Sequence, residues 1–297
     1  MNETYTASPS LAVRIRTKIG AYVQLLKLRL SLLVAISAVF GYAIAAAGTA
    51  GWDMLFWIGL GGLLVTGASN VLNQVFEKHL DAQMQRTMQR PMPTGKIGDG
   101  GALVYAMLLA ITGISILGYF FNLQAALLGI IGLLSYAFVY TPMKRLSRFS
   151  VFVGAIPGGL PPLIGWAAFT GGLETGGLIL FAFQFFWQFP HFWAIAWRLD
   201  EDYQRVGFKM LPTSSGKSRS TATLILMYTL ALVPMVFFPW QADMMGLPGV
   251  TALAGLGLLF AWPAVKLWRS LADKDAKTLM FASFLYLPLA QLVFLLA

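Results

Sequence analysis

A short stretch of chain, from Asn70 to Gly95, carries the residue types from which a cation-binding site can be built. Within it, Asn73, Glu77 and Asp81 follow one another at intervals of four residues. A helix advances about 100° per residue, so these three side chains share one stripe of a predicted helix. Mg²⁺ in proteins is usually held by one or two carboxylates together with substrate phosphates. The stripe therefore predicts a divalent-cation site with these three side chains as ligands.

Two arginines follow the stripe, at Arg86 and Arg90, before Pro91 disfavours helix at the residue that precedes it. Guanidinium groups donate forked hydrogen bonds that match phosphate oxygens. A cation backed by arginines is suited to a phosphate-bearing ligand. The alternative is a solvated helix end with ordinary charges. Acidic residues at a membrane boundary are costly and usually functional, which favours the catalytic interpretation for all five side chains.

The composition places this site in a membrane protein. The chain is 58% hydrophobic and 11% charged, whereas soluble domains carry about 25% charged residues. Apolar runs of about 18–22 residues recur and are typical of membrane-spanning helices. The absence of cysteine excludes disulfides and thiolate chemistry. With only two histidines, metal binding must rely mainly on oxygen ligands, which favours Mg²⁺, Mn²⁺ or Ca²⁺.

Nine apolar runs predict an all-α bundle that forms a single membrane-embedded domain over residues 1–297. The expected spans cover residues 22–48, 54–75, 101–119, the run from the turn at 122–124 to 140, 150–169, 176–197, 221–239, 248–265 and 278–297. A cleaved signal peptide is an alternative for the first span, because Ala45 and Ala47 imitate a cleavage site. However, its apolar core from Leu30 onward exceeds the usual length of about 7–15 residues.

Charge supports this topology. With nine spans, all 21 Lys and Arg fall on the side of the N-terminus, and the opposite side receives only acids such as Asp53, Glu174 and Asp243. The positive-inside rule then predicts that the N-terminus, with its polar segment 1–21, is cytoplasmic. The net charge of +9 is explained by cytoplasm and anionic lipid, without nucleic acid. Orientation alone accounts for most basic residues outside the loops 73–90, 140–148 and 198–219.

The first motif also resembles a known family. The pattern N-x3-E-x2-L-D-x2-M-x-R-T-x2-R-x4-G, from Asn73 to Gly95, is similar to the first aspartate-rich motif of the UbiA-type intramembrane prenyltransferases, although Glu77 stands where many members carry Asp. The resemblance implies nine helices around a central cavity, Mg²⁺-dependent ionisation of an allylic diphosphate, and prenyl transfer to an acceptor. No protein nucleophile is needed, which suits a chain without cysteine.

Three segments resemble the haem-directed branch of this family: the first motif, YTPMKR with GAIPGGLPPLIGWAA (140–168), and PHFWAIAW with EDYQRVGFKMLP (190–212). The resemblance implies farnesyl diphosphate as donor, a vinyl group of protohaem IX as acceptor, and a haem A synthase or oxidase as candidate partner. A family member that prenylates an aromatic acid or quinone precursor is the alternative. A transporter is disfavoured, because the charges gather at one membrane face.

The second acidic motif departs from the family form D-x3-D. The chain has Asp200, Glu201 and Asp202 in a row before Tyr203, so we expect Asp202, and then Glu201, to bind metal. A solvated loop is the alternative. Lys144 resembles the family residue that contacts the diphosphate, although topology alone also explains a lysine there. The residues that we expect to contact substrate are Asn70, Tyr140, Lys144, Arg145, His191 and Tyr203.

Both histidines are candidates for a contact with haem. His191 lies in the cytoplasmic half of the sixth span, and histidine is a common axial ligand of haem iron. A histidine that is hydrogen-bonded within the bundle is equally consistent. His79 lies about two residues off the acidic stripe. The aromatic residues Trp187, Phe189 and Trp193 either line a substrate slot or pack in the core.

Two further expectations concern span five and localisation. Gly and Pro in GAIPGGLPPLIGW, within residues 154–166, are expected to bend or break that helix where it lines a cavity. Residues 1–21 contain too little Ser and Arg for an organelle presequence. We therefore expect a bacterial inner membrane, with the active site on the cytoplasmic side.

Overall fold

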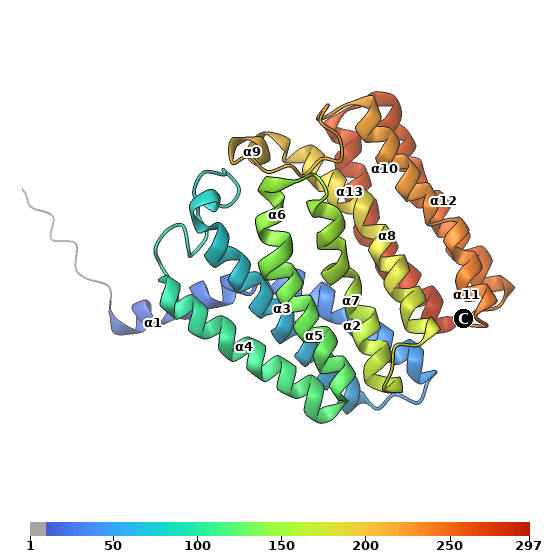
Figure 1. Ribbon diagram of the computed structural model, residues 1–297, viewed down its shortest axis with the longest axis horizontal. Coiled ribbons are helices and arrows are strands. Elements are labelled where there is room, and N and C mark those ends of the chain that lie inside the picture. The colour runs from blue at the N-terminus through green and yellow to red at the C-terminus, as the bar shows by residue number, and fades with distance from the viewer. Residues whose placement is uncertain (1–9) are drawn as a thin grey trace, which may run out of the picture.

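The computed structural model describes residues 10–297, which are helical and contain no strand. In this part of the chain, nine helical segments are long and apolar enough to cross a membrane, which confirms the predicted number. They lie side by side in one bundle (Figure 1). The segments are α2 (Leu28–Ala46), α3 (Trp52–Asp81), α4 (Asp99–Phe120), α5–η1–α6 (Leu123–Leu134, Ser135–Tyr140, Thr141–Leu146), α7 (Ser150–Thr170), α8 (Thr175–Arg198), α10–η2–α11 (Arg219–Ala231, Pro234–Val236, Phe237–Gln241), α12 (Leu247–Ser270) and α13 (Asp273–Leu296).

The connections alternate between two ends of the bundle. One end, called the basic end here, holds the loops 82–98, 147–149, 199–218 and 271–272, together with the short helix α9 (Asp200–Arg205). The other end holds the loops 47–51, 121–122, 171–174 and 242–246. Figure 1 shows α6 and α9 at the basic end, and α11 and the C-terminus at the other. Every lysine and arginine side chain that the structure describes belongs to the basic end, to the helical turns next to it or to the helix Leu11–Leu25 that precedes the first span.

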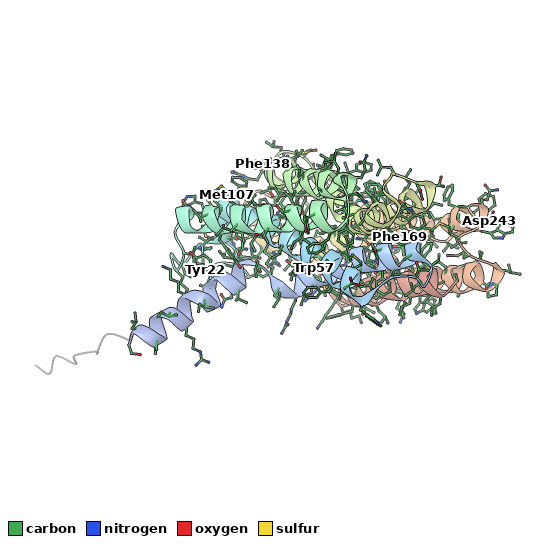
Figure 2. All side chains as sticks on the ribbon, turned by 90° about the horizontal axis from the view of Figure 1, so that it is seen from below. Tyr22, Trp57, Met107, Phe138, Phe169 and Asp243 are labelled. Atoms are coloured by element: carbon green, nitrogen blue, oxygen red, sulfur yellow. The ribbon has the colours of Figure 1, made fainter. Side chains whose placement is uncertain are left out.

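The first span starts later than predicted, at Leu28 instead of residue 22. A separate helix, α1 (Leu11–Leu25), precedes it. Its N-terminal part projects away from the bundle (Figures 1 and 2), while Ala21 and Leu25 are buried. Lys27 separates the two helices in a left-handed conformation, with φ 48°, which is uncommon for a residue with a side chain. Of the predicted polar segment 1–21, residues 1–9 lie outside the described residues, and residues 11–21 belong to α1, which Ser10 precedes.

The fourth span is also longer than predicted. Residues 140–148 were expected to form a basic loop, but the helix continues to Leu146. It passes through a π-helical segment, Ser135–Tyr140, and π-helical turns inside α-helices occur frequently at functional sites. The continuation places Tyr140 and Lys144 on a helix, with both side chains buried. A lysine can be buried there because its charge is paired with the carboxylate of Glu77.

The fifth span is not broken: α7 is a continuous helix although it contains Pro157, Pro161 and Pro162. It does line a cavity, through Pro162. Its glycines instead permit close contact with α2. A Cβ atom on Gly165 would lie 1.9 Å from the carbonyl oxygen of Ala38. A Cβ atom on Gly41 would lie 2.1 Å from the carbonyl oxygen of Pro162. Small residues bring helix backbones together in membrane proteins, where lipid removes most of the hydrophobic drive for association.

Replacing Gly165 by alanine should therefore destabilise the bundle by about 1–3 kcal/mol or more, because the added methyl group forces α2 and α7 apart. Gly255→Ala in α12 is the matched control, since a Cβ atom there would meet nothing within 4 Å. Thermal unfolding of both variants in detergent measures the difference. Equal unfolding midpoints for Gly165→Ala and the unsubstituted protein would contradict the close approach.

Helix α7 joins the two halves of the core. One hydrophobic cluster draws mainly on α1–α5 and α7, and a second draws mainly on α7, α8, α10, α12 and α13. Large apolar side chains such as Met107 and Phe138 instead cover the outside of the bundle, where each is more than half exposed (Figure 2). An apolar exterior of this kind is suited to lipid. The core thus fixes the position of α3, whose last turns carry the predicted stripe.

Candidate active site

The predicted stripe exists and is buried. Asn73, Glu77 and Asp81 lie in the last turns of α3 with exposed fractions of 2%, 5% and 1%. Helical continuation to Asp81 aligns them, as the spacing of four predicts. Buried acids are stable only when they are paired or hydrogen-bonded. Their partners therefore define the site.

Glu77 is paired with Lys144 of α6. The lysine Nζ donates to both carboxylate oxygens, at 2.9 and 3.2 Å. It also lies 4.7 Å from the centre of the Tyr140 ring, where the ring face attracts the positive charge. Both charges are buried, so this pair is screened little by water. The helical extension of the fourth span is what brings Lys144 to α3.

Asp81 is paired with Arg90 from the loop that follows α3. Arg90 Nη1 donates to Asp81 Oδ2 at 2.8 Å. The loop is fixed to the same residue by Thr87, whose Oγ1 donates to the Asp81 carbonyl oxygen at 2.9 Å. The second carboxylate oxygen, Oδ1, is buried and has no hydrogen-bond partner. A buried carboxylate oxygen without a partner is costly, and marks a position where a bound cation would be favourable.

Asn73 is held by a lysine that the sequence interpretation missed. Lys27 Nζ donates to Asn73 Oδ1 at 3.1 Å, and Asn73 Nδ2 donates to Thr141 Oγ1 at 3.2 Å. Burial, with the positive charges of Arg90 and Lys144, lowers the pKa of Lys27 to about 7. Its position just before an apolar run made orientation a sufficient explanation. The unusual backbone conformation that turns it inward cannot be recognised from the residue type.

Two further polar residues of α3 hold the junction between α1 and α2 that presents Lys27. Asn70 Nδ2 donates to Ser31 Oγ at 3.0 Å. Gln74 Nε2 donates to the Leu25 carbonyl oxygen at 2.7 Å. The amide nitrogen of Asn70 is thus engaged in this junction, and the expected substrate contact of Asn70 stays a prediction. Gln74, which was not predicted, is buried in the same way.

The second acidic cluster binds the loop that follows α3. Asp202 of α9 accepts hydrogen bonds from the backbone N–H groups of Gln85 and Arg86, at 3.2 and 3.4 Å. It also accepts one from Arg205 Nη1 at 3.2 Å. Glu201 is exposed. Asp202 thus positions the loop that carries Arg86 and Arg90.

The other predicted residues at the basic end are less enclosed. The side chains of Arg86 and Arg145 are exposed, and that of Tyr203 is half-buried. The Tyr203 ring lies 5.9 Å from that of Phe208, in the segment after α9. These three side chains belong to the basic end and are accessible at its surface.

The oxygen donors fit a hard divalent cation, although the described residues contain no cluster of three acidic or histidine side chains. The available donors are two buried carboxylates and one amide oxygen along α3. Mg²⁺ takes only one or two carboxylates and completes its shell with water and substrate oxygens. The unpartnered Asp81 Oδ1 is the position where such an ion fits best.

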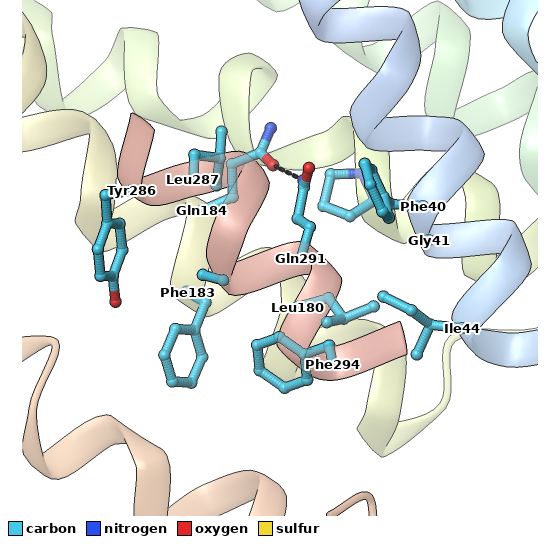
Figure 3. A pocket seen from close by; sticks show the side chains of 12 residues that line it. Phe40, Gly41, Ile44, Leu180, Phe183, Gln184, Tyr286, Leu287, Gln291 and Phe294 are labelled. Carbon is cyan, nitrogen blue, oxygen red and sulfur yellow. Dashed lines mark hydrogen bonds between the residues drawn. The ribbon is translucent and has the colours of Figure 1, made fainter. Parts of the chain in front are cut away.

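A largely apolar cavity lies deeper in the bundle, toward the end opposite the basic end. Residues of α2, α7, α8 and α13 line it (Figure 3). Gln291 Nε2 donates to Gln184 Oε1 at 3.2 Å across it. Gln184 in turn donates to the Gly158 carbonyl oxygen at 2.8 Å. The bundle therefore places an apolar interior below a charged site.

The predicted histidines and aromatic residues differ in how they are placed in the bundle. Phe189 and Trp193 are buried against each other and Tyr228, which favours packing over a substrate slot. His79 is exposed on α3. His191 is buried on α8, beside Trp187. Only the second histidine has the enclosed position expected for a substrate contact within the bundle.

Comparison with known proteins agrees with this architecture. The sequence profile of the UbiA prenyltransferase family matches residues 34–285. The protoheme IX farnesyltransferase of Cytophaga hutchinsonii is 45% identical over 278 residues, covering 93% of this chain and 96% of that protein. The enzyme of the same name from Christiangramia forsetii is 37% identical over 302 residues, covering 100% and 97%.

Solved structures share the fold. A structure from a study of digeranylgeranylglyceryl phosphate synthase superimposes with a TM-score of 0.77, at 19% identity, over 94% of this chain and 98% of that one. A UbiA homolog from Archaeoglobus fulgidus bound to GPP and Mg²⁺ gives a TM-score of 0.69 at 14% identity, over 92% and 99%. At these identities the similarity concerns the arrangement of helices.

Proposed function

The chain belongs to the UbiA prenyltransferase family, and we infer that it transfers a farnesyl group from farnesyl diphosphate to a vinyl group of protohaem IX, releasing diphosphate and forming haem O. Relatives with the corresponding name match nearly the whole chain. The observation that carries the inference is the buried stripe of α3, on which three cationic side chains converge from separate segments. Such a site suits a diphosphate with its counter-ion.

We propose that Asn73, Glu77 and Asp81 hold Mg²⁺, with Asp202 and Glu201 as candidates for a second ion. Support comes from the donor set described above and from the Archaeoglobus homolog bound to GPP and Mg²⁺. When bound, the ion supplies positive charge to the leaving diphosphate. Lys144 and Arg90 also balance the charges of Glu77 and Asp81.

Lys27, Arg90 and Lys144 are proposed to bind the diphosphate oxygens. Negative charge builds on these oxygens as the C–O bond breaks, and positioned donors in a water-poor site stabilise it strongly. Tyr140 holds Lys144 through its ring, and Asn70 holds the junction that presents Lys27. The exposed Arg86 and Arg145, with Tyr203, are proposed to attract and orient the incoming anion.

The apolar interior is proposed to receive the farnesyl chain and to shield the allylic cation from bulk water. The vinyl group attacks this cation, and water then adds to the resulting centre to give a hydroxyethylfarnesyl group. The proton that the water loses is taken up by diphosphate. We further propose that the basic end faces the cytoplasm of a bacterial inner membrane, in agreement with the positive-inside rule. A haem A synthase or an oxidase would receive the product.

The test is to express the chain in cells that make no prenylated haem of their own and to analyse extracted haems by mass spectrometry. We expect protohaem converted to haem O, with the added mass of one farnesyl group and one hydroxyl group. A prenylated phenol or quinone precursor in place of haem O would redirect the assignment to an aromatic acceptor. Cells that contain the protein in the membrane but neither product would refute both.

A further inference from the structure

His191 has the surroundings of a metal ligand. It lies on α8, seven residues before Arg198, which is about 10 Å along the helix axis. It is 8% exposed, and its Nδ1 is 2.7 Å from Ser283 Oγ of α13. Asn73 lies eight residues before the end of α3, or about 12 Å. The imidazole and the inner end of the acidic stripe are therefore at similar depths along their helices.

The hydrogen bonds determine which nitrogen carries the proton. Ser283 Oγ donates to the Met280 carbonyl oxygen at 2.6 Å. A hydroxyl has one proton to donate, so Ser283 must accept at His191, and Nδ1 must be the protonated nitrogen. Nε2 then carries a lone pair. It forms no hydrogen bond within the described residues, and unlike the indole nitrogens of Trp193 and Trp197 it is not fully enclosed.

The plane of the imidazole ring is also held. Trp187 stacks on it with ring centres 4.7 Å apart and planes at 15°. The same indole donates from Nε1 to the Ser283 carbonyl oxygen at 2.9 Å. The Phe284 ring packs edge-on against the imidazole, with ring centres 4.9 Å apart. Histidines that bind metals typically donate the other ring N–H to a fixed acceptor, which sets the tautomer and the ring orientation.

We propose that Nε2 of His191 coordinates the iron of protohaem IX and anchors this substrate with a vinyl group toward the farnesyl donor. The proposal rests on the proposed function, because it assumes haem as acceptor. Coordination uses the Nε2 lone pair, while Nδ1 keeps its proton and no electron is transferred. Of the two histidines in the chain, His79 is exposed at the basic end. Only His191 combines a fixed tautomer with burial.

The first experiment measures haem binding without turnover. Ferric protohaem IX is titrated into purified protein in nanodiscs without farnesyl diphosphate, and its absorption and EPR spectra are recorded. The unsubstituted protein and His79→Ala should show an imidazole-ligated iron. His191→Ala should lose that signature and bind haem at least about tenfold more weakly, and added imidazole should restore the signature. Ser283→Ala, which removes the acceptor for Nδ1–H, should weaken binding by about 10- to 100-fold.

The second experiment compares two acceptors in the same protein, so its result can be interpreted even if His191→Ala is partly unfolded. The unsubstituted protein should prenylate metal-free protoporphyrin IX at least about tenfold less efficiently in kcat/KM than protohaem, because the iron contact is missing. In His191→Ala this preference should disappear, and both acceptors should react equally slowly. A merely structural role for His191 would lower both rates and leave their ratio unchanged.

An unaltered iron spectrum in His191→Ala, or loss of the signature in His79→Ala, would overturn the proposal, as would equal use of both acceptors by the unsubstituted protein. These failures are distinct from failure of the proposed function. If haem O forms but His191 does not ligate iron, only the anchor is wrong. If His191 ligates iron but no prenylated haem forms, the reaction is wrong.

Discussion

Asp81→Asn should abolish haem prenylation while the protein remains folded in the membrane. The substitution keeps an oxygen for Arg90, which is bound to Asp81 Oδ2 at 2.8 Å. It removes the negative charge from the one carboxylate in this group with an oxygen that is buried and unpartnered. Metal-ion catalysis is worth several kcal/mol, and about 4 kcal/mol corresponds to about a thousandfold in rate. We therefore expect turnover to fall at least about a thousandfold.

The measurement is haem O formation per unit of membrane-inserted protein, with the unfolding midpoint recorded alongside. Asp53→Asn is the matched control, because it makes the same change at the exposed opposite end of the same helix. Its activity should equal that of the unsubstituted protein. Normal turnover in Asp81→Asn would remove this residue from the catalytic group and with it the proposed cation site.

Lys144→Ala should affect both stability and substrate binding. It leaves Glu77, which is 5% exposed, without its partner, and breaking a buried ion pair costs about 3–5 kcal/mol. It also removes a donor proposed for the diphosphate. Hydrogen bonds to charged groups contribute about 1.5–3 kcal/mol, so the KM for farnesyl diphosphate should rise about 10- to 100-fold.

A double variant separates the two effects. Glu77→Gln with Lys144→Met replaces the buried pair by neutral side chains of similar length, which should recover most of the stability. It should not recover activity, because both the carboxylate and the cation are lost. Arg148→Ala, an exposed cation nearby, should change neither quantity. An unchanged KM and unfolding midpoint in Lys144→Ala would limit this lysine to a role in topology.

Much of this architecture was predictable because its causes are local. Nine spans could be counted because each is a separate apolar run of sufficient length. The distribution of lysine and arginine supported this number, because nine spans place all of them on one side of the membrane. The stripe of Asn73, Glu77 and Asp81 followed from helical periodicity alone. Span boundaries were less accurate where a charged residue is buried, as at Lys144.

The amino-acid sequence by itself determined the membrane class, the number of helices and the acidic stripe, because period, length and charge are properties of single segments. Only the tertiary structure decided which charges meet. Lys27, Lys144 and Arg90 reach the stripe from three different segments. A buried charge is stable only with its partner, and the choice of partner depends on how α2, α3 and α6 pack. The same holds for His191, whose protonated nitrogen is set by a serine on another helix.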